Sequence, residues 1–316
     1  MTPLDYEARY HNLVVSLDGL GTTTVDVHRY QNNDAKLKAN DSLGNREALK
    51  HKDQLVWRMG VQVTELRKAA AAKLDPKEVE AFLTPAELLI REVGPVRAKQ
   101  ILDEERKAAK AIVEAHRAVG KAVHLANVEV LSGVRNTLMG VHSGKGSPEE
   151  IAIALHLVAR YKLYDKIYAS DPAAGVRDYC DKYIGLDCNG FVGNYARATG
   201  RAKVPNTPIG SYAPDKVRRT RIEDVKADDV LVWPDNGHIA VIHSIEPLST
   251  GPDGKPARDC VVVEATAGNP SDGAKTKNGG LQHSTYSIRA VGKDKIFQVE
   301  RPKGRGRSRV YIAPLS

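Results

Sequence analysis

Apolar and polar residues alternate in different ways along the chain. Between residues 45 and 125, apolar residues recur at helical spacing and are flanked by Lys and Arg. Residues 96–123 are rich in Ala, Glu, Lys and Arg with few large apolar residues, which predicts a long helix with a narrow buried face. Such helices commonly pack in helical bundles or at interfaces with a partner, which is a structural role. The alternative is that residues 45–125 form a targeting or assembly domain. Residues 13–15 and 23–27 predict two short strands.

Residues 140–146 are rich in Gly and Ser, and this composition predicts a linker. Three predicted helix starts follow it. Ser147 opens a capping box and a strongly apolar helix. Asp171 precedes a proline at the start of a second helix. Asp187 is a good N-cap, so a third helix is expected to begin at Cys188.

Beyond the third helix, the pattern changes to short apolar strands separated by turn sequences. The predicted strands cover residues 230–233, 238–245, 259–267, 281–288, 295–300 and 309–313. A helix followed by adjacent strands predicts an α+β domain with an antiparallel sheet packed on the cysteine helix. We therefore expect a mainly helical region over residues 1–140 and a second domain over residues 147–316 that folds without it.

The size and composition are those of a globular protein with two domains. The chain has 316 residues and 3 cysteines, too few for a disulfide framework. No apolar run reaches the roughly 18 residues of a membrane span, and no Cys/His group has zinc-finger spacing. We therefore expect no membrane span, no metal and no cofactor. The acidic residues 1–7 are unlike a signal peptide, so we expect synthesis in the cytoplasm without one.

The net charge of +8 lies mainly in two basic clusters, residues 218–221 and 301–309. A basic patch attracts nucleic acid, anionic lipid or an anionic wall polymer. A solvated basic surface is the plainer alternative for either cluster. Aromatic residues do not interleave with the basic ones as in a nucleic-acid groove, so nucleic acid is not the expected partner.

Cys188 is the candidate nucleophile. It follows Asp187 and so lies in the first turn of the predicted helix, where unpaired N–H groups and the helix dipole favour the thiolate. The thiolate is the reactive form of cysteine. The alternative is a buried structural cysteine.

A cysteine nucleophile needs a base and a group that orients the base. His238 opens an apolar strand directly after a turn, where it could reach a helix start packed on the sheet. Glu264 is a charged residue within the next apolar strand, and pairing with His238 would satisfy its charge. The alternatives are a surface histidine in a turn and a glutamate paired with a surface Lys or Arg.

The order of these residues resembles that of the NlpC-type cysteine peptidases, a cell-wall branch of the papain-like fold. Four motifs carry the resemblance: Asp187-Cys188-Asn189-Gly190-Phe191, Asp228-Asp229-Val230-Leu231-Val232-Trp233, Gly237-His238-Ile239-Ala240-Val241 and Val263-Glu264-Ala265. The resemblance covers roughly residues 172–300. The chain departs from the family's pattern at Asn189, where serine is usual, at Asp228, where glycine is usual, and at Glu264, where histidine, asparagine or glutamine is commoner.

The resemblance implies a papain-like α+β domain in which Cys188, His238 and Glu264 form a catalytic triad. The implied reaction is cleavage of amide bonds in peptidoglycan stem peptides through a thioester. The implied substrate-binding residues are Asp187, Asn189 and Trp233. The aspartate would bind the free amine of the stem peptide as well as capping the helix.

Two other classes of function stay open. The same thiol chemistry would serve an acyltransferase or deamidase acting on another amide or ester. A non-enzymatic assembly protein with a degenerate hydrolase domain is the third reading. A wall hydrolase without a signal peptide would act in the periplasm or on the cell wall, after specialised delivery as an effector or after release by lysis as a phage enzyme. A delivery protein or an immunity protein could then be a partner.

Overall fold

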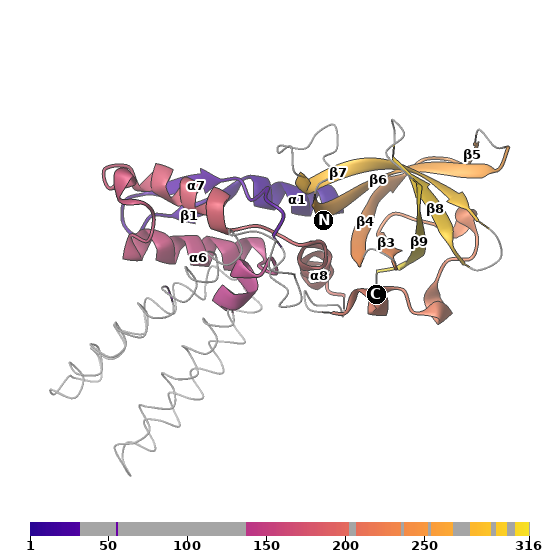
Figure 1. Ribbon diagram of the computed structural model, residues 1–316, viewed down its shortest axis with the longest axis horizontal. Helices are drawn as coiled ribbons and strands as arrows, with labels where there is room; N and C mark the ends of the chain where they lie inside the picture. Colours follow the sequence, from indigo (N-terminus) through magenta and orange to yellow (C-terminus); the bar gives the residue numbers. More distant parts are fainter. Residues whose placement is uncertain are drawn as a thin grey trace, which may run out of the picture.

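The computed structural model describes residues 1–31, 55, 137–201, 207–234, 237–251, 254–267, 279–291, 295–301 and 307–315. Apart from Leu55, the helices predicted within residues 45–125 lie outside these residues. The described residues form two parts (Figure 1). One part consists of helices and a small β-hairpin, and the other is an antiparallel β-barrel.

The helical part contains α1 (Pro3–His11), β1 (Leu13–Ser16), β2 (Thr22–Val25), α6 (Pro148–Tyr161), α7 (Pro172–Tyr183) and α8 (Cys188–Ala198). All three predicted helix starts are confirmed. The side chains of Ser147, Asp171 and Asp187 each accept a hydrogen bond from a backbone N–H of the first turn. Strands β1 and β2 pair as an antiparallel hairpin. The sequence patterns did not predict α1, which begins at a capping box formed by Thr2 and Asp5.

The barrel strands are β3 (Asp229–Trp233), β4 (His238–Ile245), β6 (Pro256–Ala267), β7 (Gly279–Ala290), β8 (Phe297–Glu300) and β9 (Arg307–Pro314), with a short β5 (Ser249–Thr250) beside β6. Neighbouring strands follow the order β4-β3-β9-β8-β7-β6, and β4 pairs again with β6. The six strands therefore form a closed antiparallel ring.

The papain-like α+β fold that the sequence predicts is wrong, because the strands close into an antiparallel barrel and the cysteine helix packs on the outside of that barrel. The strand positions are close to the predicted ones, but the pairing differs. The last strand, β9, pairs with the first barrel strand, β3, and β4 pairs along both of its edges. Closure gives every strand of the ring two neighbours, so no edge of the ring is left unpaired.

Apolar side chains fill most of the barrel interior. Near the start of β4 the interior is lined by polar side chains instead. The buried interior cluster includes Leu231, Trp233, Ala240, Ile242, Val262, Phe297, Val299, Val310 and Ile312. Side chains alternate along a strand, so the opposite face of β4 and β6 points outward. That outer face, with Ile239 and Val263, packs in a second core that includes Phe191 and Val192 of α8. Helix α8 therefore lies against the outside of β4 and β6.

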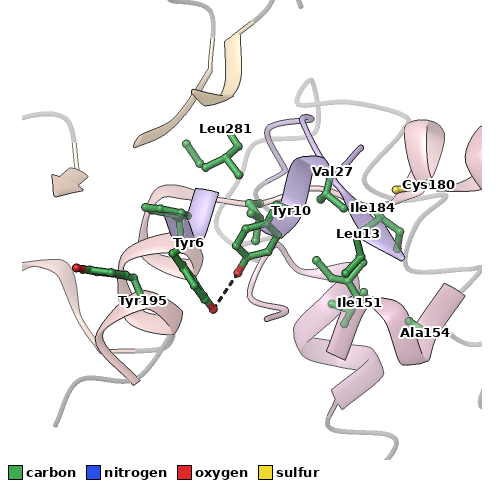
Figure 2. Close-up of a cluster of buried hydrophobic side chains, with 14 of the residues drawn as sticks. Tyr6, Tyr10, Leu13, Val27, Ile151, Ala154, Cys180, Ile184, Tyr195 and Leu281 are labelled. Atoms are coloured by element: carbon green, nitrogen blue, oxygen red, sulfur yellow. Dashed lines mark hydrogen bonds between the residues drawn. The ribbon is translucent and has the colours of Figure 1, made fainter. Parts of the chain in front are cut away.

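The N-terminal residues belong to the same core as α8. Tyr6 and Tyr10 of α1 are only 1% and 0% exposed, and their ring centroids lie 5.8 and 6.2 Å from that of Phe191. Figure 2 shows Tyr6 near Tyr195 of α8, with Leu281 of β7 and side chains of α6 in the same cluster. The boundary predicted near residues 140–146 therefore passes through one shared core.

Residues 137–142 are helical, and residues 143–146 form a turn that packs on the start of α8, so the linker predicted over residues 140–146 is wrong. The carbonyl oxygen of Gly144 accepts a hydrogen bond from the N–H of Asp187 at 3.0 Å. A Cβ atom at Gly190 would lie 1.9 Å from that same oxygen, so only glycine allows this approach. The turn thus buttresses the helix end that carries the cysteine.

Candidate active site

Cys188 is the first residue of α8 and lies beside the start of β4. The Asp187 carboxylate caps the helix by accepting the N–H of Gly190 at 2.5 Å, and it pairs with the Lys145 ammonium. The thiol is buried and lies 3.9 Å from the carbonyl oxygen of Gly237. Backbone N–H groups in a first helical turn have no carbonyl partner within the helix, so they are suited to hold a developing oxyanion.

His238 is the first residue of β4, and it joins the cysteine to the barrel interior. Its Nε2 lies 2.8 Å from Oε2 of Glu264. An ionised carboxylate can only accept, so Nε2–H is the donor and Nδ1 is left for the hydrogen bond with the Cys188 thiol. Burial alone would lower the pKa of His238, but the interactions with Cys188 and Glu264, including the negative charge of Glu264, raise that pKa to about 10.

Glu264 is fully buried on the interior face of β6 and is surrounded by donors. Its Oε1 accepts hydrogen bonds from the hydroxyls of Ser284 at 2.8 Å and Tyr286 at 3.2 Å, and from the guanidinium of Arg301. Burial would raise the pKa of this carboxyl, but the hydrogen bond from His238 and the charges of His238 and Arg301 lower it to about 2. The carboxylate is therefore ionised beside an imidazole that favours its own charged form.

The structure thus brings together the three residues predicted as a triad. A thiol at a helix start, an imidazole and an ionised carboxylate lie side by side: His238 is hydrogen-bonded to Glu264, and Cys188 is near enough to raise the pKa of His238. This arrangement can pass a proton from the thiol to the imidazole while the carboxylate stabilises the resulting imidazolium. It suits acyl transfer through a thioester.

The three predicted substrate-binding residues lie near the triad, but each has an internal partner. The Asn189 amide donates to the Thr207 carbonyl at 2.7 Å and accepts the Tyr212 hydroxyl at 3.1 Å, which fastens the loop after α8. The Trp233 ring lies 4.9 Å from the His238 ring, between centroids, and is 5% exposed. Asp187 is also buried and faces Lys145 rather than open solvent.

Sequence reasoning missed the residues that hold Glu264. They are Gln282, Ser284 and Tyr286 of β7 together with Arg301. Three polar side chains at every second position of one strand share a face, and this alternation is a signal that the sequence contains. Arg301 carried no such signal, because it opens a cluster of basic residues typical of a solvated surface.

Asp228, which stands where the NlpC-type motif usually has glycine, has a backbone conformation typical of glycine. Its φ angle is +66°, in the left-handed region where glycine is favoured. The aspartate offsets this strain through its carboxylate, which accepts the Tyr195 hydroxyl at 2.6 Å and a guanidinium N–H of Arg201 at 2.6 Å. These contacts tie the far end of α8 to the start of β3.

The basic cluster at residues 218–221 also fastens a loop. The Arg218 guanidinium lies 3.5 Å from the centroid of the Tyr311 ring, and Arg219 makes a bidentate pair with Asp229 at 2.8 and 2.9 Å. Short 3-10 turns at Ile209–Tyr212, Asp215–Val217 and Ile222–Asp224 complete this loop. Arg218 and Arg219 thus hold the connection between α8 and β3 against the barrel.

Comparison of the chain with protein-family models, curated proteins and solved structures finds no match. Among the residues that the structure describes, no cluster of three or more His, Cys, Asp or Glu side chains could hold a metal ion. The described helices also include none that is long and apolar enough to cross a membrane.

Proposed function

We propose that this protein is a cysteine hydrolase that cleaves amide bonds of peptidoglycan stem peptides. The observation that carries the proposal is the contact series from the Cys188 thiol through His238 to the ionised Glu264. The choice of substrate rests on the four motifs that resemble NlpC-type peptidases. Its site of action would be the periplasm or the cell wall, reached by delivery or lysis.

The reaction follows from the positions of the three side chains. His238 takes the thiol proton at Nδ1, and the Cys188 sulfur attacks the amide carbonyl carbon. The N–H groups at the start of α8 stabilise the oxyanion, and His238 protonates the leaving amine as the C–N bond breaks. Water then gives a proton to His238 and attacks the thioester, which breaks the C–S bond and restores the thiol. Glu264 stays ionised throughout and stabilises the imidazolium.

The test is to incubate the purified protein with peptidoglycan fragments and to identify the products by mass spectrometry. The proposal predicts two fragments whose summed mass exceeds that of the substrate by one water. Cys188→Ala and His238→Ala should abolish them, whereas Cys180→Ala, which removes a buried thiol away from the barrel, should not.

The same assay separates the other two classes of function. Transfer of the acyl group to an acceptor would join fragments without adding water, and deamidation would release ammonia. An assembly protein would give no product with any fragment. Each of these results would replace the hydrolase proposal.

A further inference from the structure

The two oxygens of Glu264 have different environments. Oε2 faces His238 at 2.8 Å, whereas Oε1 accepts from Ser284 at 2.8 Å and from Arg301. The Tyr286 hydroxyl lies 3.2 Å from Oε1 and 3.3 Å from Oε2, so it does not distinguish the two oxygens. A carboxylate can rotate about its terminal bond, and only one orientation directs Oε2 along the Nε2–H bond of His238. The triad therefore needs an interaction with Oε1 that fixes the orientation of the Glu264 carboxylate.

Arg301 is the one described cation that reaches Oε1, and it does so from the end of β8. Its Nη2 donates to Glu264, and its Nε donates to the Tyr286 hydroxyl at 2.6 Å. The guanidinium carbon lies 5.1 Å from the centroid of the Tyr286 ring, and the side chain is only 12% exposed. A planar guanidinium held at two nitrogens has a fixed direction, which a flexible ammonium lacks.

We propose that Arg301 is the positioning residue of the triad, which locks the Glu264 carboxylate with Oε2 on His238 and keeps it ionised inside the barrel. This role rests on the proposed function, because it assumes that the triad is catalytic. The hydrogen bonds and ion pair described for Arg301 go to Glu264 and Tyr286, so it acts on the triad through Glu264.

Neutral hydrogen-bond donors cannot replace Arg301, because Glu264 must also stay ionised. Hydroxyls of Ser284 and Tyr286 can orient the carboxylate, but they carry no charge. Positive charge reaches it from His238 and Arg301, and a buried carboxylate that loses one of two positive partners takes up a proton more readily. A protonated Glu264 would no longer stabilise the imidazolium of His238. Loss of the Arg301 charge should therefore raise the pKa of Glu264, and activity should be lost at a higher pH as the solution is acidified.

The first test compares Arg301→Met with Arg289→Met. Arg289 is a similarly buried arginine of the same barrel, and it pairs with Glu300 at 3.7 Å. For Arg301→Met we expect kcat to fall about tenfold or more, KM to stay the same, and the acid limb of the pH profile to move up by about 1 pH unit or more. Arg289→Met should keep the acid limb of the wild type.

A second readout does not depend on the natural substrate. The rate of Cys188 alkylation by iodoacetamide, followed against pH, reports the thiolate–imidazolium pair directly. Its acid limb should move up in Arg301→Met as well. If the wild type cleaves no peptidoglycan, the proposed function fails, and the alkylation profile still decides the role of Arg301.

Arg301→Lys covers the case in which the methionine variant does not fold. Lysine keeps the charge but cannot hold Tyr286 and Glu264 in one plane, so the acid limb of alkylation should stay near that of the wild type while kcat falls. If no turnover substrate is found, the rate of alkylation at its plateau should fall instead. Wild-type rates in Arg301→Lys, or identical profiles for the two methionine variants, would overturn the proposal.

Discussion

Replacing Glu264 by Gln should make the protein less stable at neutral pH and should abolish part of its acid sensitivity. Glutamine nearly preserves the side-chain volume, so volume alone predicts little change in stability. The surroundings predict otherwise, since Arg301 and His238 both lose their counter-charge inside the barrel. The variant therefore separates the effect of charge from that of packing.

The pKa of Glu264 sets the magnitude. It is lowered from 4.5 to about 2, and at about 1.4 kcal/mol for each pKa unit this corresponds to about 3 kcal/mol of folding free energy. Because the folded-state pKa is the lower one, this contribution is present above pH 4.5 and is lost as the pH falls toward 2. The variant should thus be about 3 kcal/mol less stable at pH 7, and the difference should shrink in acid as the wild-type carboxyl becomes protonated.

The assay is urea unfolding followed by circular dichroism at a series of pH values between neutral and strongly acidic. Glu246→Gln, at an exposed position just after β4, is the matched control and should follow the wild-type curve. Activity should fall about tenfold or more in Glu264→Gln, because a neutral amide hydrogen bond is weaker than a charge-assisted one. Parallel stability curves for the wild type and Glu264→Gln, together with unchanged activity, would refute the assigned role of Glu264.

Iodoacetamide near neutral pH should label Cys188 before the other two thiols, because burial raises the pKa of Cys260 to about 12 and raises that of Cys180 further; mass mapping that finds either of those first would contradict this. Asp228→Ala should lose about 2 kcal/mol in a denaturant titration, whereas Asp228→Gly should lose less, because glycine adopts φ +66° without strain; equal losses would show that strain at this position is unimportant. A fragment of residues 145–316 should unfold without cooperativity in a thermal scan, since it lacks Tyr6 and Tyr10 of the shared core; a sharp transition would show that this fragment has a core of its own.

Local chemistry made the helix starts and the strand positions predictable. Ser147, Asp171 and Asp187 cap helices because each has a side-chain acceptor beside free N–H groups, and this needs no tertiary context. The contact between His238 and Glu264 was also foreseen, because a charged residue in an apolar strand requires a partner.

Long-range pairing was not predictable in the same way. Closure of the barrel depends on pairing between β3 and β9, which are far apart in the sequence. The alternation of apolar and polar residues within a strand does not determine which strand it pairs with. The stretch at residues 140–146 has the composition of a linker, and only the contact between Gly144 and the start of α8 reveals its packing role. Arg301 was hidden for a related reason, since one buried arginine in a basic cluster looks like its solvated neighbours.

In the proposed reaction, Cys188 forms a thioester with the substrate. The most direct measurement is to mix the protein with peptidoglycan fragments, quench in acid within the first turnover, and map the added mass by peptide mass spectrometry. We expect an acyl group on the peptide that contains Cys188, absent in Cys188→Ala, and we expect it to disappear as product forms. Product formation by Cys188→Ala at the wild-type rate would rule out a thioester on Cys188.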